Sequence, residues 1–249
     1  MREFNQDSKR LIDIGPTLSQ AFRVLSLICA LLVVMIHVPV DLTLPSGWWT
    51  SRIFHTGICR IAVPFFFFAA GFFLAGHCDE RGWWRREVSK RCKSLLIPYI
   101  VFAVAYATVM WGLVLWSSNL YDPSHTQAEN LAYVTNPLNM LGLVPYDRPV
   151  LRLLWFVRGL FVFVVLSPFL VFLIQDRFGF GFFVITAVCA FGANLVHRMG
   201  FPSEWMELFY MGMLPFGGLF HFSAGLFMRQ NACIFTQFMS PYFILLGGG

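Results

Sequence analysis

One histidine and a few arginines are the residues in this sequence best placed to do chemistry. Arg23 and His37 lie fourteen positions apart in an apolar run, so in a helix they differ by about 40° in azimuth and by roughly 21 Å along the axis. A guanidinium can hold phosphate, and a neutral imidazole can take a proton from a hydroxyl. The spacing therefore predicts an anion contact at one end of the helix and a general base at the other. The structural alternative, a topology anchor and a hydrogen-bonded histidine at a helix end, stays open.

Three further charged residues lie in or beside apolar runs. Arg60 precedes an apolar run that contains Pro64, and it could face the same cavity as His37 or extend to the membrane interface. Arg158 lies several residues inside an apolar run, where it needs a carboxylate, a carbonyl cluster or water. Glu207 is the candidate partner, in a purely structural pair or in a substrate-binding one. No spacing of histidine, cysteine and acidic residues predicts a metal site.

The elements that must position these residues are membrane-spanning helices. The chain has 249 residues, of which 57% are hydrophobic and 12% charged, against about 25% charged in soluble domains. Spanning helices need apolar runs of about 20 residues. Such runs recur along the sequence at roughly 22–40, 58–76, 94–116, 153–175, 178–196 and 206–228. The prediction is an all-α bundle of six to seven spanning helices, with residues 1–249 forming a single membrane domain.

Basic residues gather beside two of these runs and predict the orientation of the chain. They precede the first helix and fill a predicted turn at 77–93, and such clusters mark the cytoplasmic side. The N-terminus is therefore expected in the cytoplasm and residues 117–150 outside. Because the cations stand at helix ends, the net charge of +5 reflects topology rather than nucleic-acid binding.

Four stretches, in order, resemble the acyltransferase 3 family of bacterial membrane proteins. They read RVLSLICALLVVMIH, VPFFFFAAG, RCKSLLIPY and LWF. The family's usual arginine lies eleven residues before the histidine, where this chain has Ser26, and Arg23 lies about one turn earlier. Members usually have about ten spanning helices, so the resemblance implies that this chain covers roughly the first two thirds of the domain and is an incomplete ten-helix domain.

The resemblance implies transfer of an acyl group, most simply acetyl, from cytoplasmic acyl-CoA to a hydroxyl of a cell-envelope glycan or similar acceptor. It implies a multi-pass protein of the inner (plasma) membrane, with the lipid bilayer, the donor and the acceptor as partners and no permanently bound cofactor. In this interpretation His37 is the catalytic base, Arg23 and the basic turn hold donor phosphates, and Arg60 neutralises charge on the acyl oxygen. The alternatives are a transporter or flippase, and an inactive fragment.

Overall fold

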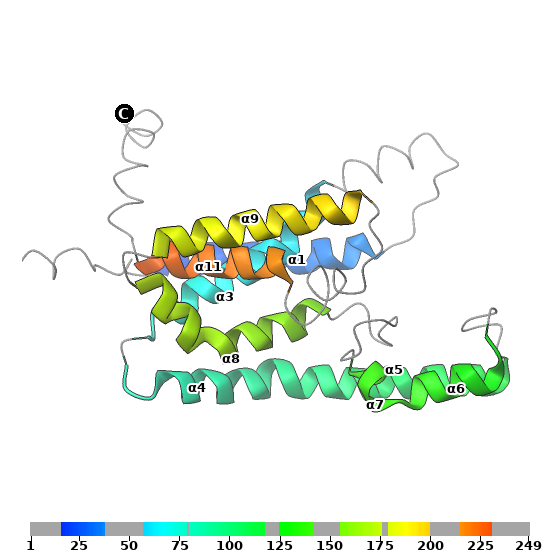
Figure 1. Ribbon diagram of the computed structural model, residues 1–249. Helices are drawn as coiled ribbons and strands as arrows, with labels where there is room; N and C mark the ends of the chain where they lie inside the picture. The colour runs from blue at the N-terminus through cyan, green and yellow to red at the C-terminus, as the bar shows by residue number, and fades with distance from the viewer. Residues whose placement is uncertain are drawn as a thin grey trace, which may run out of the picture. The chain divides into compact units, whose positions relative to one another are not determined.

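The computed structural model describes residues 16–37, 57–78, 80–117, 125–141, 155–175, 179–199 and 215–230, and in these ranges every regular element is helical (Figure 1). The predicted all-α class is therefore confirmed. Within the ranges that the structure describes, five helices are long and apolar enough to cross a membrane. They are Pro16–Ile36, Ile58–Ala75, Trp83–Trp116, Trp155–Ile174 and Gly179–Val196. The sixth predicted run overlaps α11 (Phe216–Gln230), and its first part lies outside the described residues.

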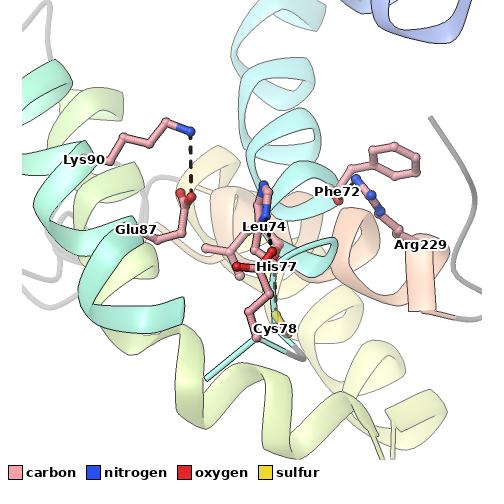
Figure 2. A network of polar contacts seen from close by, with 8 residues as sticks. Phe72, Leu74, His77, Cys78, Glu87, Lys90 and Arg229 are labelled. Carbon is pink, nitrogen blue, oxygen red and sulfur yellow. Dashed lines mark hydrogen bonds and ion pairs between the residues drawn. The ribbon is translucent and has the colours of Figure 1, made fainter. Parts of the chain in front are cut away.

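The basic segment between the second and third spans is mostly helix, which corrects the predicted turn at 77–93. α4 (Trp83–Arg91) continues through a π-helical turn, η4 (Cys92–Leu96), into α5 (Ile97–Trp116). The buried carboxylate of Glu87 lies 3.8 Å from Lys90 Nζ (Figure 2). It also lies 3.7 Å from Arg91 Nε. These ion pairs, at spacings of three and four residues, stabilise α4 against the mutual repulsion of its basic side chains.

The chain divides into two compact units. Residues 1–81, 169–186 and 220–249 form unit 1, and residues 82–168 and 187–219 form unit 2. Three described helices, α8 (Trp155–Gln175), α9 (Gly179–Arg198) and α11, contribute to both units, and the division within α8 follows Pro168. The prediction of one membrane domain over residues 1–249 stays a prediction.

In unit 1, α1 (Pro16–Ile36) packs against a short 3₁₀ turn, η3 (Ile58–Ile61), and against α3 (Ala62–Ala75). The buried ring of Phe22 stacks on Phe72 with centroids 5.2 Å apart and meets the edge of Phe73 at 4.9 Å. Phe22 is near the start of α1 and Phe72 near the end of α3, while η3 also contacts α1. The two helices therefore run antiparallel.

Two glycines bring α3 and α11 into close contact within unit 1. A Cβ atom at Gly71 would collide with the backbone carbonyl of Phe222, and one at Gly225 would collide with the carbonyl of Phe68. Small residues allow this approach of two helix backbones in membrane proteins. Gly71 ends the VPFFFFAAG stretch, so the last position of that motif serves helix packing.

In unit 2, part of the predicted outer connection folds into two short helices, α6 (Gln127–Thr135) and α7 (Pro137–Met140). A capping box of Thr126 and Glu129 starts α6, and the Asn136 side chain caps α7. Both helices pack on α5. At the start of α6, Gln127 Nε2 donates to the Val114 carbonyl at 2.9 Å and so satisfies a carbonyl in the last turn of α5.

Candidate active site

His37 follows the last residue of α1 and is exposed. Its Nδ1 lies 2.7 Å from the Val33 carbonyl oxygen, one turn earlier in the chain. Because a carbonyl only accepts, Nδ1 carries the hydrogen in this contact, and in the neutral ring Nε2 then holds the lone pair. The bond is the one that a helix-end histidine would make, and it also gives His37 the tautomer that a general base needs.

Arg60 lies at the same end of the α1–α3 pair as His37. It belongs to η3, which contacts α1, and its side chain is exposed. The neighbouring Cys59 is buried and fixes the turn to the core. Since α1 and α3 run antiparallel, the end of α1 and the start of α3 meet. The sequence-based expectation that Arg60 and His37 face one cavity stays a prediction.

Arg23 lies toward the opposite end of α1 and is exposed. Its neighbour Phe22 faces α3, which turns the Arg23 side chain about 100° from the packed face. Ser26, at the position where the family usually has arginine, is half-buried, and its hydroxyl donates to the Phe22 carbonyl at 2.7 Å. Arg23 is therefore more exposed than Ser26. It lies on the same side of α1 as His37, about 40° away in azimuth.

In unit 2, Arg158 makes polar contacts with Leu141 and with Tyr99, the last residue of the RCKSLLIPY stretch. Its Nη1 donates to the Leu141 carbonyl at 3.4 Å, and its guanidinium hydrogen-bonds the hydroxyl of Tyr99. Tyr99 in turn donates its hydroxyl to the same Leu141 carbonyl at 2.8 Å. A carbonyl and a phenol thus compensate the arginine, as its apolar run requires. Glu207, the predicted partner, lies outside the described residues.

Sequence reasoning gave Tyr99 no role, although it ends one of the four stretches. The side chain is 5% exposed and packs with Ala103, Leu141 and Val157. A buried tyrosine hydroxyl needs a hydrogen-bond partner. The position of Tyr99 near the start of an apolar helix was therefore the one signal in the sequence that its hydroxyl takes part in a polar contact. The backbone carbonyl of Leu141 offered no signal, because every residue has one.

A basic groove lies on one face of the helix that begins with α4. The groove is open to its surroundings and has a volume of about 520 Å³. It is lined by Arg85, Arg86, Ser89, Lys90 and Lys93. Four cations and a hydroxyl on one face suit a phosphate-bearing ligand. Among the described residues, no group of three or more histidine, cysteine and acidic side chains is placed to hold a metal ion.

The helices, the intramembrane arginines and the histidine at a helix end define a polytopic helical membrane protein with polar side chains inside its apolar segments. A family model for an acyltransferase domain, that of the acyltransferase 3 family, matches residues 21–249. The chain therefore belongs to the acyltransferase 3 family, as the resemblance implied. No curated protein and no solved structure matches the chain significantly.

Proposed function

We propose that this protein is a membrane-bound O-acyltransferase that moves an acyl group, most simply acetyl, from acyl-CoA to a hydroxyl of a cell-envelope glycan. The family match over residues 21–249 carries the proposal. The acyl-CoA donor enters from the cytoplasm, and the protein lies in the inner membrane with its N-terminus inside. The family assignment favours this function over transport, the other class that the sequence left open.

His37 is the proposed general base. Its Nε2 takes the proton of the acceptor hydroxyl while the oxygen attacks the thioester carbonyl. The tetrahedral intermediate then breaks its carbon–sulfur bond, and the CoA sulfur leaves with the proton held by the imidazolium. The Nδ1 contact with the Val33 carbonyl supports this role because it holds the ring in the tautomer whose Nε2 can accept a proton. Arg60, from the same end of the α1–α3 pair, would neutralise charge on the acyl oxygen.

The donor's phosphates have two proposed contacts. Arg23 is exposed and lies about 21 Å from His37 along the helix axis, which suits a long donor whose phosphates and thioester are far apart. The basic groove on α4, with Arg85 and Arg86 among its lining residues, offers a second set of cations. Arg158 and Glu207 remain proposed contacts for substrate.

The test is acyl transfer by the full chain in membranes supplied with acetyl-CoA labelled in the acetyl group. Label should accumulate in hydroxyl esters of envelope material. The His37→Ala variant should lose about 10²- to 10⁴-fold of the rate, the usual contribution of a general base. Arg23→Ala should instead raise the KM for acetyl-CoA, because its role is to bind phosphate.

Two matched variants separate chemistry from structure. His37→Asn keeps an N–H that can reach the Val33 carbonyl but has no basic nitrogen, so it should fold normally and be as inactive as His37→Ala. His77→Ala removes an exposed histidine that lies 3.5 Å from Glu80, and it should keep nearly full activity. Near-normal transfer by a well-expressed His37→Asn variant would refute the assignment of the base.

A further inference from the structure

The basic groove on α4 lies where a long helix leaves the apolar layer of the membrane. The helix formed by α4, η4 and α5 covers Trp83–Trp116 and has 34 residues, so it is about 50 Å long, whereas the apolar core of a bilayer is about 30 Å thick. The 20 residues of α5 fill that thickness by themselves. Lys93, at one end of the groove, lies about 6 Å before the first residue of α5. This end of the groove is therefore at the depth of the lipid headgroups.

The cations of the groove share one face of this helix, and the protein holds the opposite face. The five lining residues fall at intervals of three and four positions, which places their side chains side by side. On the other face Glu87 is buried, and Trp84 Nε1 donates to the Val165 carbonyl of α8 at 3.0 Å. Ser89, in the groove, lies about 200° around the helix from Glu87. The groove therefore opens away from α8.

An exposed apolar strip continues the groove along the same helix. It follows Lys93 at intervals of four and three residues and consists of Ile97, Val101 and Val104, which are 54%, 60% and 45% exposed. Side chains at these intervals lie in line on a helix. One face thus carries cations at headgroup depth and, next to them, apolar side chains at the depth of the acyl chains. A phospholipid has the same order of chemistry, a phosphate joined to apolar chains, whereas the nucleotide end of CoA has no apolar chain.

We propose that the groove on α4 binds the headgroup phosphate of an anionic phospholipid in the cytoplasmic leaflet, and that the acyl chains of this lipid lie along the apolar strip. Anionic lipids attract basic segments directly beside a membrane span. The guanidinium and ammonium groups hold the phosphate, and the Ser89 hydroxyl can donate to one of its oxygens. Lipid binding here is separate from acyl transfer, and Arg23 stays the donor's phosphate contact. CoA is the other phosphate ligand proposed for these cations, and the experiment separates the two.

Native mass spectrometry of the full chain, released from neutral detergent, measures its affinity for phosphatidylglycerol and for phosphatidylcholine of the same chain length. The wild type should bind phosphatidylglycerol more tightly, because that headgroup carries a net negative charge. The double variant Arg85→Gln/Lys93→Gln should bind phosphatidylglycerol about 20- to 30-fold more weakly, at about 5-fold for each cation removed. It should bind phosphatidylcholine as the wild type does. Both side chains are exposed, so the double variant should fold normally.

Arg81→Gln is the matched control, because it removes an exposed cation that does not line the groove. The inference fails if Arg81→Gln weakens phosphatidylglycerol binding as much as the double variant does, or if the wild type binds the two lipids alike. CoA added to the complex with phosphatidylglycerol should leave the lipid bound. If CoA displaces the lipid, the groove belongs to the donor and the lipid assignment is wrong. A wild type that binds phosphatidylglycerol selectively but transfers no acyl group would contradict the proposed function alone.

Discussion

The Tyr99 hydroxyl and the Arg158 guanidinium converge on one acceptor, the carbonyl oxygen of Leu141. They also hydrogen-bond each other. Tyr99 ends the RCKSLLIPY stretch of the family resemblance, and Arg158 lies two residues after the LWF stretch, Leu154–Phe156. The contact therefore joins the third stretch to the helix that the fourth one opens. Two short, mostly apolar sequence patterns thereby meet in one polar cluster in unit 2.

Removing this hydroxyl tests whether the cluster stabilises the protein. Tyr99→Phe should lower the free energy of unfolding by about 1–3 kcal/mol, because it leaves a half-buried guanidinium short of one partner. Thermal unfolding in detergent measures the change, and Tyr106→Phe on the same helix is the control and should cost less. A double-mutant cycle with Arg158→Met should give a coupling energy of about 0.5–3 kcal/mol. A coupling near zero would mean that the two side chains act independently.

Gly71→Ala tests the close approach of α3 and α11. The new methyl group would meet the backbone carbonyl of Phe222, which cannot rotate away as a side chain can. The substitution should lower the free energy of unfolding by about 1–3 kcal/mol through overpacking. Gly112→Ala in α5 is the matched control: nothing lies near its Cβ, and it should be neutral or slightly stabilising. Equal effects of the two substitutions would show that helix propensity, not contact, governs Gly71.

The capping box of α6 predicts a dependence on pH. The Thr126 backbone N–H and then its hydroxyl, each 2.8 Å from Glu129 Oε2, lower the pKa of the Glu129 carboxyl below its ordinary value of 4.5. A lowered folded-state pKa means that the ionised carboxylate stabilises the helix. This contribution is complete above pH 4.5 and is lost as the pH falls through the lowered pKa.

Hydrogen exchange of the α6 amides, corrected for the intrinsic rate at each pH, measures this loss. Wild-type protection should fall on acidification below the ordinary glutamate pKa. Glu129→Gln can still cap the helix but does not titrate, so its protection should stay flat over the same range. The same acid-induced fall in Glu129→Gln would assign the titration to another group.

The orientation in the membrane is tested with two single cysteines placed in a background from which the six native ones are removed. Ser89 lies in the basic groove on α4, and Ala128 lies near the start of α6; both are exposed. The basic cluster should remain in the cytoplasm. A membrane-impermeant thiol reagent added to intact cells should therefore label Ala128→Cys and spare Ser89→Cys until the cells are lysed. The reverse pattern would invert the topology.

The sequence alone was enough to predict an all-α chain with helices long and apolar enough to span a membrane, and to predict the family to which it belongs. In a bilayer each segment must satisfy its own backbone hydrogen bonds and present apolar side chains over a fixed length, so the signal is local and can be read without a fold. The order of four short stretches, Arg23–His37, Val63–Gly71, Arg91–Tyr99 and Leu154–Phe156, was enough for the family.

Only the tertiary structure decided what these residues contact. Arg158 bonds the Leu141 carbonyl and Tyr99, and Arg229 bonds the Phe72 carbonyl. A backbone carbonyl has the same chemistry at every position, so composition and spacing cannot single one out. A polar side chain in an apolar helix predicts from sequence that a partner exists. Which atom fills that need depends on which backbones the packing of whole helices brings near.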